Sequence, residues 1–249
     1  MRQAAVETKP EKKNIFLPPL LLITLAVMLL TSGTIFMLRR AEKEAAPTLL
    51  EQVSEKAAAA AVFKHYALVI EESGPGYSLR FSGQVHEDRM YGKIDGYDLE
   101  IFAEEERFFV KNAVAAGWQD LKTAKLETLP VLLRDPHYLL STLLAEKDIV
   151  VEAGSNRTVN NAACQTYFLE IPPPALQLLT HFGSEAVIDK LQVYLWFAEE
   201  DAFLHRMAVM MNVTVGEQSI HINRTYNLTC DAPDFPEDIP KTDTKTMPI

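Results

Sequence analysis

The chain has 249 residues, a net charge of −10 and an apolar fraction of 48%, a composition that excludes a wholly disordered or collagen-like protein. The acidic balance also excludes a typical nucleic-acid-binding protein, because phosphate contacts require a basic face. Two cysteines are too few for a disulfide scaffold or a cysteine-based zinc site.

The first element is a long apolar segment, residues 15–38, which carries no charged residue over 24 positions. As a helix with a rise of about 1.5 Å per residue it reaches about 36 Å, enough to cross a hydrocarbon core of about 30 Å. A cleaved signal peptide is the alternative, but its apolar region is usually shorter, and no good small-x-small cleavage site follows here. The segment is therefore predicted to be an uncleaved transmembrane signal anchor.

The orientation of this anchor follows from the segments on its two sides. Residues 1–14 carry four basic residues and residues 39–43 carry three, which is nearly balanced under the positive-inside rule. A long folded domain, however, crosses the membrane largely regardless of its charge. We therefore expect residues 1–14 to be a cytoplasmic tail of a single-pass cell-membrane protein whose bulk lies outside the cytoplasm.

Residues 39–64 are predicted to form a helical stalk and first helix. The segment is rich in alanine, the best helix former, and has no proline after Pro47. The following residues, 65–232, alternate between apolar and polar side chains, which predicts antiparallel strands. The expected strands cover residues 78–86, 89–94, 97–103, 107–112, 149–152, 163–171, 191–197, 203–213 and 220–228.

Local signals place the turns and helices between these strands. Asp95-Gly96 favours a tight hairpin, and Asp135-Pro136 has the pattern of an N-cap followed by the first helical residue. A second short helix is expected over residues 174–182. The proline-containing and acidic residues 233–249 predict an extended, partly mobile C-terminal tail.

Together these elements predict an α+β domain over residues 65–232. Long antiparallel strands curl through their own twist, so a curved antiparallel β-sheet, or half-barrel, is expected. The helices are expected to cover its concave face.

Several segments of this pattern carry a resemblance to a known family. They are Ser78–His86, the hairpin around Asp95-Gly96, Phe108–Lys111 leading to Trp118, Asp135–Leu140, Cys164–Leu169, Leu195–Phe197 with the Leu204–Met207 strand that follows it, and Asp238–Pro240. In this order they resemble the lipoprotein-carrier superfamily, with its LolA/LolB-like and LprG/LppX-like proteins. The resemblance implies a bacterial cell-envelope protein whose half-barrel holds acyl chains in an apolar cavity. A transmembrane anchor and the absence of a lipidated cysteine depart from the family, and favour a tethered protein over a diffusing shuttle.

The apolar side chains on the inward faces of the strands are the candidate ligand site. An open cavity for a lipid or lipophilic ligand explains their alternation, and a closed core packed against the helices explains it equally well. Methionine suits a lipid-binding surface because it is flexible and polarizable. The residues expected to line the cavity are Leu79, Phe81, Val85, Leu99, Ile101, Tyr167, Leu169, Val193, Leu195, Met207, Val209 and Met211.

Cys164 and Cys230 are predicted to form a disulfide. They lie 66 residues apart in an exported segment, where a bridge closing such a loop contributes about 4 kcal/mol in the chain-entropy model. Two separately buried thiols are the alternative.

The sequence contains no recognisable catalytic, metal or cofactor motif. Its six histidines are scattered, without metal-ligand spacing, and its acidic clusters lie at predicted turn tips. We therefore expect no enzyme, cofactor or metal centre. The leading hypothesis is a membrane-anchored extracytoplasmic protein that binds a lipid or lipophilic ligand without covalent chemistry. The alternative is a tethered interaction or envelope-sensor module with a filled core, which docks a membrane partner protein.

Overall fold

The computed structural model describes residues 47–105, 107–112, 117–172, 179 and 186–240. The chain divides into two compact units, and every described helix and strand belongs to the second, Thr48–Ile249. The predicted anchor, residues 15–38, lies outside the described residues, as does the predicted helix over 174–182 apart from Leu179. Among the helices that are described, none has the length and apolarity needed to span a membrane.

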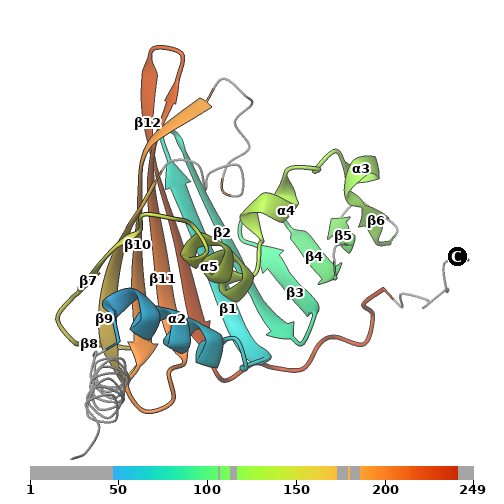
Figure 1. Cartoon of the computed structure of the whole chain (residues 1–249). Coiled ribbons are helices and arrows are strands. Elements are labelled where there is room, and N and C mark those ends of the chain that lie inside the picture. Colours follow the sequence, from blue (N-terminus) through green and yellow to red (C-terminus); the bar gives the residue numbers. More distant parts are fainter. Residues whose placement is uncertain (1–46, 106, 113–116, 173–178, 180–185, 241–249) are drawn as a thin grey trace, which may run out of the picture. The chain divides into compact units, whose positions relative to one another are not determined.

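The described part of this unit is built around a 12-stranded antiparallel sheet (Figure 1). The strand order is β6-β5-β4-β3-β2-β1-β12-β11-β10-β9-β7, and β8 also pairs with β9. The strands are β1 (His65–Gly74), β2 (Tyr77–His86), β3 (Arg89–Ile94), β4 (Leu99–Glu104), β5 (Arg107–Asn112), β6 (Gln119–Asp120), β7 (Val150–Ala153), β8 (Arg157–Val159), β9 (Ala162–Ile171), β10 (Ala186–Ala198), β11 (Leu204–Val215) and β12 (Gln218–Thr229).

The strands that come first and last in the sequence, β1 and β12, lie side by side in the middle of the sheet. β1 pairs antiparallel with β12, from Ala67 opposite Thr229 to Ser73 opposite Asn223. The strands predicted over residues 78–112 and those predicted over residues 149–228 are thus joined into one sheet. No strand was predicted over His65–Gly74, so this junction was not foreseen.

Four short helices are described: α2 (Leu49–Ala60), α3 (Leu121–Ala124), α4 (Leu129–Leu132) and α5 (Pro136–Leu144). A capping box starts α2, in which Glu51 N donates to Thr48 Oγ1 at 3.2 Å and Thr48 N donates to Glu51 Oε2 at 2.7 Å. The helix ends at Ala60, before the end of the predicted 39–64 segment. The predicted N-cap Asp135 is confirmed, because its Oδ1 accepts a hydrogen bond from Tyr138 N at 2.8 Å.

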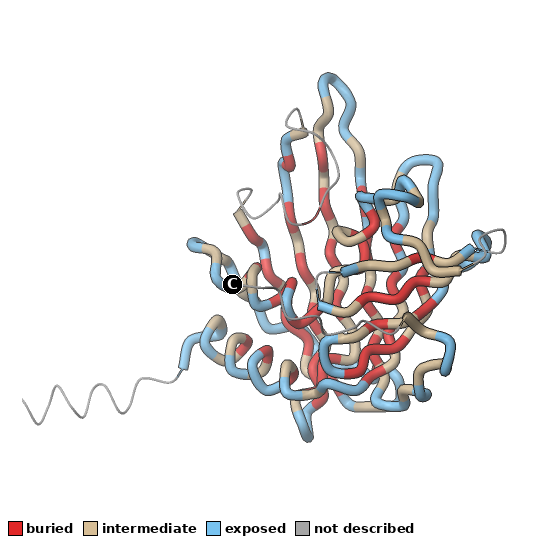
Figure 2. The backbone as a smooth tube through the Cα atoms, turned by 90° about the vertical axis from the view of Figure 1, so that its right-hand side faces the viewer, coloured by how far each residue is buried: buried red, intermediate tan, exposed pale blue. Residues whose placement is uncertain are grey.

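One face of the sheet packs against the helices and is here called the inner face; the opposite one is the outer face. Buried and exposed residues alternate along the strands (Figure 2). The inner face contributes side chains such as Leu68, Ile70 and Leu195 to a single hydrophobic core. The helices complete that core with Val53, Ala57, Leu132, Leu139, Leu140 and Leu143.

Two glycines that face each other in β2 and β3 make room for the buried ring of Phe81. Gly83 pairs with Gly92, and Phe81 is fully buried on the same inner face. A Cβ on Gly83 would lie 2.4 Å from the carbonyl oxygen of Tyr91 and 2.5 Å from Cζ of Phe81. The backbone of β3 and the ring of Phe81 therefore lie too close to position 83 for any residue other than glycine.

A buried ion pair crosses the junction of β1 and β12. Arg224 is 1% exposed, and its Nε donates to Glu72 Oε2 at 2.5 Å. The same guanidinium donates to the carbonyl oxygens of Val131, at 3.2 Å, and Leu179, at 3.1 Å. It thus fastens α4 and residue 179 to the centre of the sheet.

The C-terminal segment, predicted as a partly mobile tail, is bound to the sheet over its described residues, 233–240. We call these residues the strap. The side-chain Nε2 of Gln84 donates to the carbonyl oxygen of Asp234 at 3.0 Å, and Trp118 Nε1 donates to that of Asp238 at 2.9 Å. The strap therefore runs along the outer face of the sheet from β2 towards Trp118, so these residues of the predicted tail have specific partners.

Aromatic contacts complete the binding of the strap. The ring of Phe235 stacks on that of His86, with 4.4 Å between centroids, and the guanidinium of Arg89 lies 5.3 Å from the centre of the Phe235 ring. The ring of Phe102 on β4 lies edge-on to Phe235 and is only 1% exposed, although it points to the outer face. The strap thus helps to form a second, smaller apolar cluster on the outer face of the sheet, opposite the main core.

We expect Phe235→Ala to weaken this attachment. Loss of a half-buried ring removes about 1–2 kcal/mol from the free energy of unfolding. The change would be measured by urea unfolding of the Trp196→Phe background, in which Trp118 under the strap is the remaining tryptophan. An unchanged midpoint together with unchanged Trp118 fluorescence would show that the strap is not held by this ring.

Candidate functional site

All twelve residues predicted to line a cavity lie on the inner face of the sheet. Ten are buried, and Leu79 and Leu99 are partly buried against the same core. The predicted orientation of the strands is therefore right. Most of these side chains pack against one another and the helices, and of the twelve only Val85 borders the pocket described next.

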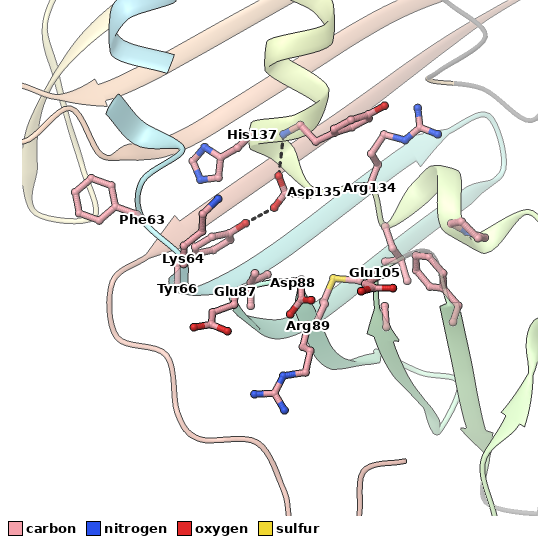
Figure 3. A pocket seen from close by; sticks show the side chains of 17 residues that line it. Phe63, Lys64, Tyr66, Glu87, Asp88, Arg89, Glu105, Arg134, Asp135 and His137 are labelled. Atoms are coloured by element: carbon pink, nitrogen blue, oxygen red, sulfur yellow. Dashed lines mark hydrogen bonds between the residues drawn. The ribbon is translucent and has the colours of Figure 1, made fainter. Parts of the chain in front are cut away.

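A pocket with a volume of about 610 Å³ lies between the strand ends of β1–β5 and the segment that links α4 to α5 (Figure 3). This size falls within the usual range of small-molecule pockets, about 300–1,000 Å³. Its apolar wall includes Phe63, Val85, Met90, Ala103, Phe108 and Leu133.

Charged side chains surround this apolar wall. The mixed rim consists of Lys64, Glu87, Asp88, Arg89, Glu105 and Arg134. Tight turns hold it in place. Glu87, with φ 59°, donates its backbone N–H to the carbonyl oxygen of Lys64 at 2.8 Å, and Glu105 N donates to that of Asp88 at 3.1 Å.

Three polar side chains meet where α5 begins. The hydroxyl of Tyr66 donates to Asp135 Oδ2, while the other oxygen of Asp135 caps α5. Burial, reinforced by the Asp135 carboxylate, raises the pKa of Tyr66 well above its usual value, so the phenol stays protonated. The ring of His137 stands edge-on to that of Tyr66, with 5.4 Å between centroids.

His137 lines the pocket and is 9% exposed. Neither of its ring nitrogens has a hydrogen-bond partner among the described residues. Burial lowers the pKa of this imidazole, Asp135 opposes that shift, and Lys64 adds to it. His137 is therefore held in its neutral form near neutral pH.

Tyr66, Asp135 and His137 were not predicted to form a site. Asp135 was predicted only as a helix cap, and His137 was grouped with the other scattered histidines. A histidine that follows the cap of a leucine-rich helix was the one signal available. The contact with Tyr66, 69 positions from Asp135, has no counterpart in the local pattern.

The predicted disulfide is not formed: Cys164 and Cys230 are free thiols, the first buried and the second exposed. Strands β10 and β11 lie between the strand of Cys164 and β12, which ends beside Cys230. The two cysteines are therefore not on paired strands, an arrangement that would bring their Cα atoms within the distance of about 7 Å that a disulfide requires. Within the described residues, no group of three or more His, Cys, Asp or Glu side chains is arranged to hold a metal ion.

A stripe of aromatic side chains lies on the outer face of β9 and β10. Phe168 and Tyr194 have ring centroids 5.0 Å apart, and Tyr194 stacks on Trp196 at 6.1 Å. The guanidinium of Arg206 lies 5.8 Å from the centre of the Trp196 ring. These rings are half-buried, so part of their apolar surface faces solvent.

Comparison with known proteins identifies the fold. No family model and no curated protein sequence matches the chain. Among solved structures, the lipoprotein LppX of Mycobacterium tuberculosis aligns with a TM-score of 0.51 and 14% identity, over 74% of this chain and 95% of LppX. The chain therefore has a LolA/LppX-like fold, as the resemblance in its sequence implied.

Two further structures align with lower scores. MucB of Pseudomonas aeruginosa, solved in complex with MucA, has a TM-score of 0.37 and 14% identity, over 74% of this chain and 59% of that one. A putative outer membrane lipoprotein-sorting domain from Vibrio parahaemolyticus has a TM-score of 0.28 and 7% identity, over 72% and 89% of the two chains.

Proposed function

We propose that this chain, with its LolA/LppX-like fold, is an extracytoplasmic half-barrel protein that binds a lipid or lipophilic ligand and is tethered to the membrane by residues 15–38. The observation that carries the proposal is the pocket of about 610 Å³ with an apolar wall and a charged rim. Binding would consist of burial alone, with no covalent step.

The energetics of burial favour an acyl chain as the occupant. Each methylene transferred from water contributes about 0.8 kcal/mol, so a chain of about a dozen carbons has a large gross driving force. Met90 and Phe108 supply flexible and flat apolar surface for such a chain. The charged rim would keep the polar end of the ligand at the mouth of the pocket.

Filling the pocket should reduce the bound lipid. Ala103 lines the pocket from β4, so Ala103→Trp places an indole in the space an acyl chain would use. We expect wild type, isolated from bacterial membranes in mild detergent, to carry several-fold more solvent-extractable lipid than this variant. Mass spectrometry of the organic extract, normalised to protein, measures the difference.

The matched control is Ala208→Trp, which makes the same change on the outer face of β11. It should retain the lipid of the wild type, because that surface is remote from the pocket-lining residues. Equal lipid in wild type, Ala103→Trp and Ala208→Trp would count against binding in this pocket.

A second candidate function is a tethered module that docks a membrane partner protein. The observation that favours it is the filled core, in which most of the residues first assigned to a cavity are fully buried. The half-exposed stripe of Phe168, Tyr194 and Trp196 offers an apolar outer surface for such docking. A lipid-free wild type in the extraction experiment would favour this function over the first.

A further inference from the structure

His137 differs from the other polar residues of the pocket in its hydrogen bonding. Among the described residues that line the pocket, it is the side chain whose buried polar atoms lack hydrogen-bond partners. An imidazole needs partners at both nitrogens, and burying it without them is unfavourable. The imidazole of His137 is therefore available, at the wall of the pocket, to form hydrogen bonds with a group that does not belong to the described residues.

Tyr66 and Asp135, two polar residues beside His137 at the start of α5, are already bonded to each other. The hydroxyl of Tyr66 is directed to Asp135, and the two carboxylate oxygens of Asp135 accept from Tyr66 and from the backbone of Tyr138. Figure 3 shows His137 beside these residues and near Lys64, at the wall of the pocket. Each oxygen of Asp135 thus already accepts one hydrogen bond, and neither comes from His137.

The charges around His137 restrict what the partner can be. Asp135, the N-cap of α5, and Lys64, just before β1, are the charged groups that act on the imidazole, and Asp135 is bonded to Tyr66, whose ring meets that of His137. A negatively charged ligand group would be placed against the Asp135 carboxylate. A neutral oxygen, by contrast, can accept from one imidazole nitrogen while a hydroxyl donates to the other.

We propose that the ligand of this pocket is a neutral acyl lipid with an ester carbonyl and a free hydroxyl, of the monoacylglycerol class, and that His137 hydrogen-bonds to that group. The acyl chain would lie on the wall formed by Val85, Met90 and Phe108. This inference rests on the proposed function and adds the polar class of the ligand and the residue that selects it.

The test uses the full-length chain in detergent and three photoreactive probes that share one apolar chain: a monoacylglycerol, a fatty acid and a hydrocarbon. The readout is the probe concentration that half-saturates labelling of the peptide containing Val85 and Met90. We expect the monoacylglycerol to half-saturate at about tenfold lower concentration than the hydrocarbon, the factor that corresponds to one buried hydrogen bond. His137→Phe should remove that difference, and His137→Gln, which keeps a donor and an acceptor, should restore part of it.

The melting temperature distinguishes a role of His137 in selecting the ligand from a purely structural role. His137→Phe replaces an imidazole that has no hydrogen-bond partner in the described part of the chain by an apolar ring of similar shape, so the melting temperature without probe should rise by about 2–4 °C. His205→Phe is the matched control, because Nδ1 of His205 is also buried without a partner among the residues that the structure describes, but His205 lies outside the pocket. It should leave the labelling by all three probes unchanged.

Each failure has a distinct meaning. Saturable labelling with equal midpoints for monoacylglycerol and hydrocarbon would overturn the role of His137 and leave the proposed function standing. Tighter binding of the fatty acid would overturn the neutral class of the ligand. A lower melting temperature in His137→Phe, with all probes weakened alike, would show that the residue is structural. The absence of saturable labelling by any probe would overturn the proposed function itself.

Discussion

Arg224→Met is expected to lower the free energy of unfolding by about 3–5 kcal/mol. The change leaves Glu72, 8% exposed, as a buried carboxylate without its cation. It also removes the hydrogen bonds to the carbonyl oxygens of Val131 and Leu179. Urea unfolding of residues 48–249, followed by circular dichroism, measures the loss.

The double variant Glu72→Met/Arg224→Met separates the charge from the packing. Replacing both partners by apolar side chains removes the uncompensated charge, so we expect it to recover most of the stability lost in Arg224→Met. Glu72 also accepts a hydrogen bond from the hydroxyl of Tyr77 at 2.9 Å, which the double variant gives up. A double variant as unstable as the single one would assign the loss to the contacts with α4 and residue 179.

Gly83→Ala is expected to lower the free energy of unfolding by about 3 kcal/mol, the upper end for overpacking. The new methyl group would meet the carbonyl oxygen of Tyr91 at 2.4 Å, and a backbone atom in a paired strand cannot move without loosening the β2–β3 ladder. Chemical denaturation of the variant, with circular dichroism as the readout, tests this.

Gly117→Ala is the control for this substitution. No heavy atom lies within 4 Å of a Cβ built at Gly117, so the change should stay within about 0.5 kcal/mol of wild type. In the background of Gly83→Ala, Phe81→Leu should recover part of the loss by vacating the space of the ring. Equal stabilities of the two alanine variants would refute the steric account.

Local signals in the sequence predicted the elements that depend on local contacts. Arg89–Ile94 and Arg107–Asn112 are strands with the predicted bounds, and α5 begins at its predicted cap. The inner orientation of the strands also followed from simple alternation. These features require only the period of a strand and the chemistry of a turn.

Features that depend on distant partners were not predicted. β1 contains Glu71 and Glu72, and a buried glutamate at an inner position makes sense only once Arg224, 152 residues later, is in place. The strap was predicted as a mobile tail because proline and acidic residues are typical of loops. Its partner Gln84 lies 150 residues away.

The candidate site combines both cases. Val85 was assigned to a cavity from its alternation, and it does border the pocket. The rest of the wall, which comes from the ends of β3, β4 and β5, from Phe63 and from the α4–α5 link, was not assigned to a cavity. His137 stands out because it is buried and because its neighbours Tyr66 and Asp135 are hydrogen-bonded to each other. Neither feature can be read from a single sequence.

The pairing of β1 with β12 has a consequence for how the protein is made. Because Ala67 pairs with Thr229, the first strand to emerge during synthesis has its second partner only when nearly the whole domain has followed. Until then one long edge of β1 presents unpaired backbone groups, a template for aggregation. Contacts between such distant segments also slow folding. Early release of β1 is therefore a hazard specific to this topology, and the strap, which follows β12 in the sequence, can bind only once nearly all strands of the sheet have been made.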